Sequence, residues 1–476
     1  MATAAATALN AQQVGGVLKA GGVKIKITDL RCAIIGRNPV IRITTDQGVT
    51  GHGQAESAKA YLKPMVLFYK PYLMGDDPTN VARIMYKIRR LGAFKPWGAA
   101  VSAIEIALWD IAGQVAGVPV YELLGGKIRD KVCAYGNSEN NTTIFSPKNV
   151  QEYAEMAAQL KAAKENYTLV KMPVAFHSDP MMVAEPNSWY GQHYTGRAGP
   201  YMDRGMMTER GMDNVLAVTE AIKKVLGPDI NLALDCGPGW AIKDAIRFAR
   251  AVEPYHVAWL EDLITGDGEP YPNAQAFREV TQATSTPIHT GEEIYLRENF
   301  KDLIEMQAVD VLGPDPEDVG GIAELKWIAE YANLHDIQVA PHGIFDGLFG
   351  VAAQVHLGAA CPQNYIGFEY AKGQPDWWYE IVDGLPNPIV KNGYIDVWDK
   401  PGLGVTFNVA AATTRSYSTA SKPACSPCQT TPPSSLATAN PLPSPKSAST
   451  TPSSSVSANQ RTHCPPQPAA SSPPQH

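Results

Sequence analysis

Acidic and histidine residues recur at a near-constant interval through the second half of the chain. Six short apolar runs each end in one of them, at steps of 23 to 31 residues: Asp235, Glu261, Glu292, Asp315, His342 and Glu369. A strand, a helix and two short loops occupy about that length, so the pattern predicts repeated βα units in a parallel sheet. Such connections are right-handed, and many in a row close into a barrel whose active site lies at the carboxyl ends of the strands. We expect all six residues at that end.

Three of these residues, Asp235, Glu261 and Glu292, are carboxylates on consecutive predicted strands. Placed close together they repel one another, and a hard divalent cation relieves the repulsion. Mg²⁺ fits best, with water and a substrate oxygen completing its ligands. The alternative is that each acid is solvated or caps the following helix. Three acids in register with a histidine favour the metal site.

His342 lies one predicted βα unit beyond Asp315, so neighbouring strand ends can bring the two side chains together. A carboxylate bonded to one imidazole nitrogen fixes the tautomer and stabilises the protonated ring. His342 is therefore a candidate general base. Asp315 alone could instead cap a helix, and its pairing with His342 argues against that role.

Two further residues have more than one possible role. Glu369, on the last predicted strand, can donate a hydrogen bond to a developing enolate oxygen if it is protonated, or it can be a simple ion-pair acid. Lys171, on the second predicted strand, can contact a substrate carboxylate, serve as a base with a lowered pKa, or lie in solvent.

The chain before the barrel predicts a small α+β domain. Val23 to Gly53 is strand-like, with a hairpin at Asp46-Gln47-Gly48, and two apolar helical stripes follow. Asp77-Pro78 predicts the start of the first of these helices. The expected organisation is an N-terminal extension (1–22), a capping domain (23–127, completed by about 385–409), a barrel (128–384) and a disordered tail rich in Pro, Ser and Thr (410–476).

The first two barrel strands are predicted at Lys131–Gly136 and Thr168–Val174, and a long irregular segment, 176–212, follows the second. A loop of that length inside a compact domain is usually functional or mobile. Its position over the catalytic end makes four of its polar side chains candidates for substrate binding: His177, Tyr190, His193 and Arg197.

Composition narrows the partners and the compartment. The net charge of −7 and a charged fraction of 18% give no nucleic-acid footprint, and the longest apolar runs are far short of a membrane span. Cysteines spread singly through the predicted domains are expected to be free thiols in a reducing compartment. We expect a cytoplasmic homo-oligomer, with organelle import by the N-terminal extension left open.

The chain resembles the enolase superfamily, specifically its mandelate racemase/muconate lactonizing enzyme subgroup, from about Val23 to Asn408. The resemblance is carried by Leu234-Asp235, Trp259-Leu-Glu261-Asp262, Thr290-Gly-Glu292, Gly313-Pro-Asp315 with Gly320-Gly321, Pro341-His342-Gly, Phe368-Glu369, Ala107-Leu-Trp-Asp110-Ile-Ala-Gly and Pro119 to Gly126. It implies an α+β capping domain on a modified TIM barrel, (β/α)7β. It also implies Mg²⁺ held by the three acids, a His342–Asp315 base, and Glu369 stabilising an enolate.

Two departures from that family pattern bear on the reaction. Relatives often carry Lys-x-Lys on the second strand, where this chain has Lys171-Met-Pro173, and Gly237 replaces a residue that is often polar. Both changes remove proton-transfer groups from the side opposite His342. The resemblance is therefore greatest to sugar-acid dehydratases, in which one histidine removes the α-proton and then protonates the leaving β-hydroxyl, giving a 2-keto-3-deoxy acid.

Two other functions stay open. A racemase, epimerase or cycloisomerase of another carboxylate would need a second base, which His177, Tyr190 or His193 could supply. A non-catalytic binding or scaffold protein would have no need of the acids and His342.

Overall fold

The computed structural model describes residues 24–35, 38–56, 61–91, 98–137, 147–174, 188, 190, 206–237, 240–264, 272–343, 347–371 and 378–408. All of them belong to one folded unit. The predicted N-terminal extension and C-terminal tail, and most of the predicted loop 176–212, lie outside these residues.

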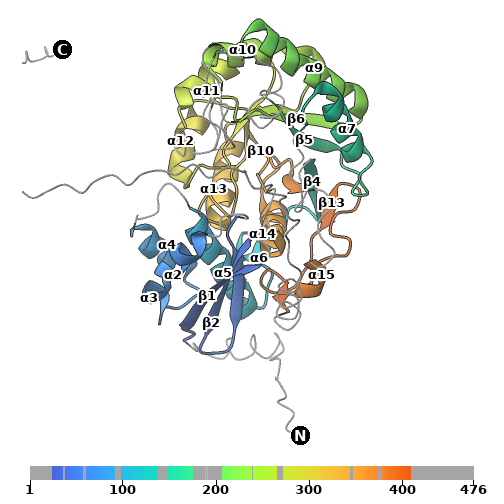
Figure 1. Cartoon of the computed structure of the whole chain (residues 1–476). Helices are drawn as coiled ribbons and strands as arrows, with labels where there is room; N and C mark the ends of the chain where they lie inside the picture. The colour runs from blue at the N-terminus through green and yellow to red at the C-terminus, as the bar shows by residue number, and fades with distance from the viewer. Residues whose placement is uncertain are drawn as a thin grey trace, which may run out of the picture. The chain divides into compact units, whose positions relative to one another are not determined.

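The N-terminal part is an antiparallel sheet followed by helices (Figure 1). Its elements are β1 (Ile27–Ile35), β2 (Asn38–Thr45), β3 (Thr50–Gln54), α2 (Leu62–Phe68), α3 (Lys70–Leu73), α4 (Val81–Arg89), α5 (Ala99–Ala116) and α6 (Val120–Leu123). The predicted hairpin joins β2 to β3: Gly48 has a φ of 77°, and the Thr45 N–H donates to the Val49 carbonyl at 3.0 Å. The predicted α+β order is confirmed.

Two local predictions in this part are wrong. The strand begins at Ile27, so most of the alternating run from Val23 precedes it. Helix α4 begins at Val81 instead of Pro78. The Asp77 carboxylate accepts hydrogen bonds from the N–H of Thr79 (2.9 Å) and from its hydroxyl (2.7 Å), which closes a turn ahead of the helix.

The described residues after α6 alternate strand and helix in the order of a (β/α)7β barrel, as predicted (Figure 1). The strands are β4 (Lys131–Asn137), β5 (Leu169–Pro173), β6 (Asn231–Asp235), β7 (Trp259–Glu261), β8 (Ile288–Thr290), β9 (Val311–Leu312), β10 (Gln338–Val339) and β11 (Phe368–Ala371). The helices between them are α7 (Val150–Lys161), α9 (Glu209–Leu226), α10 (Ile242–Ala251), α11 (Ala274–Thr281), α12 (Arg297–Glu305), α13 (Ile322–Asn333) and α14 (Gly347–Ala360), with a 3-10 turn η2 (Glu253–Tyr255). Each strand pairs in parallel with its neighbours in the order β10-β9-β8-β7-β6-β5-β4-β11.

Hydrogen bonds between β10 and the chain around β11 close this sheet on itself. The Ile366 N–H donates to the Val339 carbonyl at 2.8 Å, and the Glu369 N–H donates to the Pro341 carbonyl at 3.0 Å. A closed sheet leaves no strand edge exposed and brings His342 and Glu369 to adjacent positions on the wall.

The C-terminal described residues return to strand β4. They contain α15 (Trp378–Ile381), β12 (Val382–Asp383), β13 (Tyr394–Asp396) and β14 (Thr406–Phe407). Strand β13 pairs antiparallel with β4, and β12 pairs with β14.

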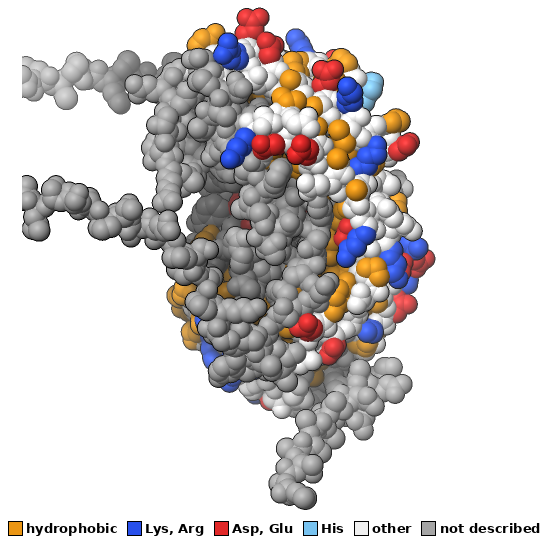
Figure 2. All heavy atoms as spheres, turned by 45° about the vertical axis from the view of Figure 1, so that its right-hand side comes forward, with side chains coloured by type: hydrophobic (Ala, Val, Ile, Leu, Met, Phe, Trp, Pro, Cys, Tyr) orange, Lys and Arg blue, Asp and Glu red, His pale blue; other side chains and the backbone are white. Residues whose placement is uncertain are grey.

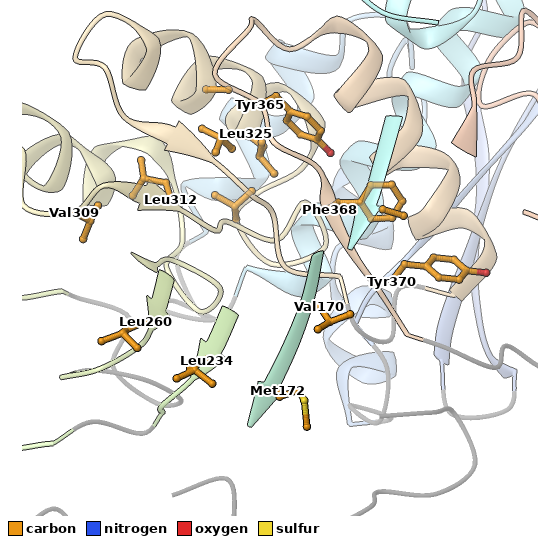
Figure 3. Close-up of a cluster of buried hydrophobic side chains, with 14 of the residues drawn as sticks. Val170, Met172, Leu234, Leu260, Val309, Leu312, Leu325, Tyr365, Phe368 and Tyr370 are labelled. Atoms are coloured by element: carbon orange, nitrogen blue, oxygen red, sulfur yellow. The ribbon is translucent and has the colours of Figure 1, made fainter. Parts of the chain in front are cut away.

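Side chains alternate between the two faces of each barrel strand. Outward residues, among them Val170, Met172, Leu234 and Leu260, belong to the main core between strands and helices (Figure 3). Inward residues form a separate buried layer: Tyr135, Leu169, Ala233, Trp259, Val311 and Ala340. Two positions further along the same strands stand Lys171, Asp235 and Glu261, so the period-two alternation places them on the interior side as well.

Helix α5 is long and apolar enough to cross a membrane by length and composition, but 78% of it is buried inside the protein. It packs against β3, α2 and α4. It is therefore the central core helix of the N-terminal part.

Candidate active site

The mouth of the barrel holds a histidine–carboxylate pair. His342, three residues past β10, and Asp315, three residues past β9, are both buried, and His342 Nδ1 lies 2.7 Å from Asp315 Oδ2. That contact leaves His342 Nε2 directed at other acids, 3.6 Å from Glu292 Oε2 and 3.7 Å from Glu369 Oε2. The geometry is that of an imidazole oriented through one nitrogen and available through the other.

The charges around His342 favour its protonated form. Burial lowers the pKa of His342, but the hydrogen bond to Asp315 and the negative charge of Glu369 outweigh burial and raise the pKa to about 10. For the acid Asp315, burial has the opposite effect and raises the pKa, although the hydrogen bond to His342 lowers it.

Lys171 lies at the centre of the interior acids. Its Nζ is 2.5 Å from Glu261 Oε1, 3.0 Å from Glu369 Oε2 and 3.5 Å from Asp235 Oδ2. Burial lowers the pKa of Lys171, but these carboxylates outweigh burial and raise it well above the usual value. The possibility that Lys171 lies in solvent is wrong, because its side chain is 2% exposed. Its raised pKa gives no support to a role as a base with a lowered pKa.

The three predicted metal ligands lie on neighbouring strand ends. Asp235 and Glu261 are Cα partners across β6 and β7, and Glu292 follows β8 by two residues. Among the residues that the structure describes, no three His, Cys, Asp or Glu side chains are placed to share one ion. The ammonium of Lys171 lies against two of these acids instead. Mg²⁺ prefers carboxylate oxygens as ligands, so the three residues fit that metal chemically.

Glu369 is fully buried and lies inside β11 instead of at its end. The side-chain amide of Asn137, at the end of β4, donates a hydrogen bond to Glu369 Oε1. The register explains this contact: Asn137 is the Cα partner of Ala371, which lies two residues after Glu369 and therefore on the same face of β11. Sequence reasoning missed Asn137, whose only signal was its place at the end of the first predicted strand.

A second missed group lies beneath Glu261. Trp259 Nε1 donates to Glu261 Oε2 at 3.1 Å, and His289 Nδ1 lies 3.5 Å from the same oxygen. The two rings stack with centroids 5.2 Å apart. Burial lowers the pKa of His289, which keeps it neutral beneath the charged layer. These rings fix the orientation of the Glu261 carboxylate.

Of the four predicted substrate-binding residues, His177, His193 and Arg197 lie outside the described part of the chain. Tyr190 is described: its N–H donates to the Met206 carbonyl at 3.0 Å, and its side chain is 66% exposed. Its part in substrate binding stays a prediction.

Charge is distributed differently at the surface and in the site. On the face drawn in Figure 2, acidic and basic side chains are interspersed. In the site, the charged groups Lys171, Glu261 and Glu369 are at most 2% exposed. Electrostatic interactions there are strong because little water screens them. The fold and site together define a capped (β/α)7β-barrel protein with buried acid–base groups at the carboxyl end of its strands.

Comparisons with known proteins agree with this class. The family described as "Mandelate racemase / muconate lactonizing enzyme, N-terminal domain" matches residues 28–125, and "Enolase C-terminal domain-like" matches residues 153–412. The chain belongs to the mandelate racemase/muconate lactonizing enzyme family of the enolase superfamily, which confirms the resemblance seen in its motifs.

Curated relatives and solved structures cover most of the chain. It is 31% identical to a D-xylonate dehydratase of Haloferax volcanii, over 85% of this chain and 92% of that protein. It is 30% identical to a D-mannonate dehydratase of Caulobacter vibrioides, over 84% and 97%. A mandelate racemase/muconate lactonizing enzyme-like protein from Rubrobacter xylanophilus is 29% identical, with a TM-score of 0.71, over 82% of this chain and 98% of that one. A 3,6-anhydro-D-galactonate cycloisomerase from Zobellia galactanivorans is 25% identical, with a TM-score of 0.65, over 82% and 99%.

Proposed function

We propose that the chain is a Mg²⁺-dependent dehydratase of a sugar acid, an aldonate or an aldarate. The dehydratases of D-xylonate and D-mannonate to which it is similar match it over nearly their whole length. The observation that carries the proposal is the His342–Asp315 pair, with its free nitrogen turned toward Glu292 and Glu369. The proposed enzyme is a cytoplasmic homo-oligomer acting on a small carboxylate.

The proposed reaction uses one histidine twice. His342 Nε2 removes the proton from the carbon next to the substrate carboxylate, while Asp315 holds Nδ1 and stabilises the imidazolium. The C–O bond to the β-hydroxyl then breaks, and His342 returns its proton to that oxygen, so that water leaves. The resulting enol takes up a proton and becomes a 2-keto-3-deoxy acid. Lys171 contributes a fixed positive charge to the substrate carboxylate. Glu369, in its protonated form, donates a hydrogen bond to the developing enolate oxygen.

Asp235, Glu261 and Glu292 are the residues proposed to hold Mg²⁺. When bound, the cation withdraws electrons from the substrate carboxylate, which acidifies the α-proton, and offsets the negative charge that raises the pKa of His342. Trp259 and His289 keep the Glu261 carboxylate oriented toward that position.

The test is a screen of aldonic and aldaric acids with Mg²⁺ for 2-keto-3-deoxy products. We expect turnover of at least one of them, and none in EDTA. Exchange of the substrate α-proton with D₂O without any elimination would instead favour an isomerase. The similarity to a cycloisomerase is the specific observation behind that second candidate. Absence of both reactions and of Mg²⁺ binding would favour a non-catalytic protein.

Replacing Lys171 separates its two cationic roles. We expect Lys171→Met to raise the substrate KM, because a positive charge facing the substrate carboxylate is lost. We expect it also to tighten Mg²⁺ binding by about tenfold, because a unit charge beside the acids no longer opposes the metal. Calorimetric Mg²⁺ titration and steady-state kinetics measure the two effects. Lys243→Met, at an exposed lysine paired with Glu279, is the control. Weaker Mg²⁺ binding in Lys171→Met would contradict the assignment of these acids.

A further inference from the structure

Helix α5 of the N-terminal part contacts the barrel at the loop that carries Asp315. The loop runs from Asp315 to Gly321 and leads into α13, and all of its residues are buried. Figure 1 shows α5 and α13 in the two parts of the molecule, and the hydrogen bonds below connect them. The two parts match different family models, so these contacts join two domains.

Glu105, on α5, caps the beginning of α13. Its Oε2 accepts a hydrogen bond from the N–H of Ile322 at 2.7 Å, and its Oε1 accepts one from the N–H of Ala323 at 2.9 Å. The preceding residue, Gly321, has no side chain with which to cap the helix. The first N–H groups of a helix lack partners within it and favour a negative charge, so a carboxylate from another domain fills the role of a local cap.

Two neighbouring residues hold the same loop. Ser102 Oγ accepts from the Gly320 N–H at 2.9 Å, and Arg89 Nη2 donates to the Gly320 carbonyl at 2.9 Å. Arg89 also binds Glu324, in the first turn of α13, at 2.6 Å. Both peptide groups of Gly320 are thus bound to the N-terminal domain.

The two domains approach each other closely at two glycines. A Cβ on Gly321, whose φ is +108°, would lie 2.1 Å from Glu105 Oε2. A Cβ on Gly98, just before α5, would lie 1.9 Å from the Asp318 carbonyl oxygen. Only glycine fits at these two positions, which lets the backbones approach closely.

The other end of the loop is held by Asp315 itself. Its carbonyl accepts from the N–H groups of Asp318 (3.0 Å) and Val319 (2.7 Å), and its Oδ1 accepts from the Glu317 N–H at 2.6 Å. The remaining oxygen, Oδ2, is the one that contacts His342. The direction of that oxygen therefore depends on where the turn lies, and the turn is anchored through Gly320 and Gly321.

We propose that Glu105 is a positioning residue for the His342–Asp315 pair: by capping α13 from the N-terminal domain, it fixes the turn that aims Asp315 at His342. The capping domain thereby takes part in orienting the general base. This inference rests on the proposed function of that pair. A role in stability alone is the alternative, and the two make different predictions when Asp315 is also altered.

The test is a double-mutant cycle of Glu105→Gln and Asp315→Asn, at pH 8. Burial raises the pKa of Glu105 to about 7, although bonds from Ala323 and Trp109 lower it, so pH 8 keeps the wild-type carboxylate ionised. We expect Glu105→Gln to lower kcat by about 10- to 100-fold, because small misplacements of a catalytic group cost rates of that order, with little change in KM. In the Asp315→Asn background the same substitution should have almost no further effect, since coupled residues are not additive.

Asp110→Asn is the matched control. Asp110 is a second buried acid of α5, and it accepts backbone N–H groups of His52 and Leu403, away from the Asp315 loop. It should lower the melting temperature as Glu105→Gln does, but its effect on kcat should be the same with and without Asp315. Equal effects of Glu105→Gln in both backgrounds, or an unchanged kcat, would overturn the proposal.

A readout independent of turnover separates this inference from the proposed function. The Nδ1–H of His342, hydrogen-bonded to Asp315, should give a downfield proton resonance, identified by its loss in His342→Asn. We expect Glu105→Gln to shift or broaden it and Asp110→Asn to leave it in place. If the wild type converts no carboxylate, the proposed function fails, while an unshifted resonance in Glu105→Gln would overturn the positioning role. Ser102→Ala replaces Glu105→Gln in both measurements if that variant does not fold. It removes the contact to the Gly320 N–H and a hydrogen bond to the Gly98 carbonyl within the N-terminal domain, and it leaves the Glu105 cap in place.

Discussion

His342→Asn is expected to lower turnover of the active sugar acid by at least about 10²–10⁴-fold, the usual contribution of one general acid–base group. It should also stop exchange of the substrate α-proton with solvent. The reason is that β5 ends in Pro173, which has no exchangeable proton, and that Lys171 carries a raised pKa among three carboxylates. Turnover by coupled assay and proton exchange in D₂O by NMR measure the two losses.

Asp315→Asn serves as the graded companion to that variant. It keeps the imidazole but removes its orienting carboxylate, so we expect a large defect that is smaller than that of His342→Asn. His256→Asn is the control: His256 is exposed and has a φ of 49°, a conformation that asparagine tolerates, so activity should be unchanged. Persistent α-proton exchange in His342→Asn would place the base elsewhere, and the single-base dehydratase would have to be abandoned.

Glu261→Gln is expected to abolish Mg²⁺-dependent activity while leaving the fold largely intact. Glutamine has nearly the same shape as glutamate, and its amide oxygen can still accept a hydrogen bond from Lys171 or from Trp259, but not from both. It lacks the charge that holds a hard cation. Even residues that only orient metal ligands contribute about 10- to 100-fold to metal affinity, so the loss of a ligand should cost at least 100-fold. Calorimetric Mg²⁺ titration, with circular dichroism to verify folding, measures this loss.

The control for that variant is Glu279→Gln, on the exposed surface of α11, where the acid pairs with Lys243. Its Mg²⁺ affinity and turnover should equal those of the wild type. If Glu261→Gln bound Mg²⁺ normally and remained active, the metal would have to be held by other residues.

Several features of the fold were predictable because they depend on local pattern. Strand β4 was predicted at Lys131–Gly136 and spans Lys131–Asn137, and β5 was predicted at Thr168–Val174 and spans Leu169–Pro173. Few architectures are compatible with short apolar runs that are each followed by an amphipathic helix. Because the crossovers between parallel strands are right-handed, a closed barrel is the architecture that fits. Competition between a turn and a helix start is harder to predict. Asp77 closes a turn with Thr79, so α4 begins three residues later than its Asp-Pro signal indicates.

By itself, the sequence determined which strand each of the residues Asp235, Glu261, Glu292, Asp315 and His342 ends or closely follows, since spacing along the chain sets the position of each residue relative to its strand. It could not determine what each side chain contacts. The cation at Glu261 is Lys171 from a different strand, the partner of Glu369 is Asn137, and Glu105 caps a helix more than 200 residues further along the chain. Such contacts depend on strand register, barrel closure and the close approach of two domains at glycine. Residues distant in sequence form ion pairs and hydrogen bonds with one another only when those three conditions are met. These contacts are therefore decided by the tertiary structure alone.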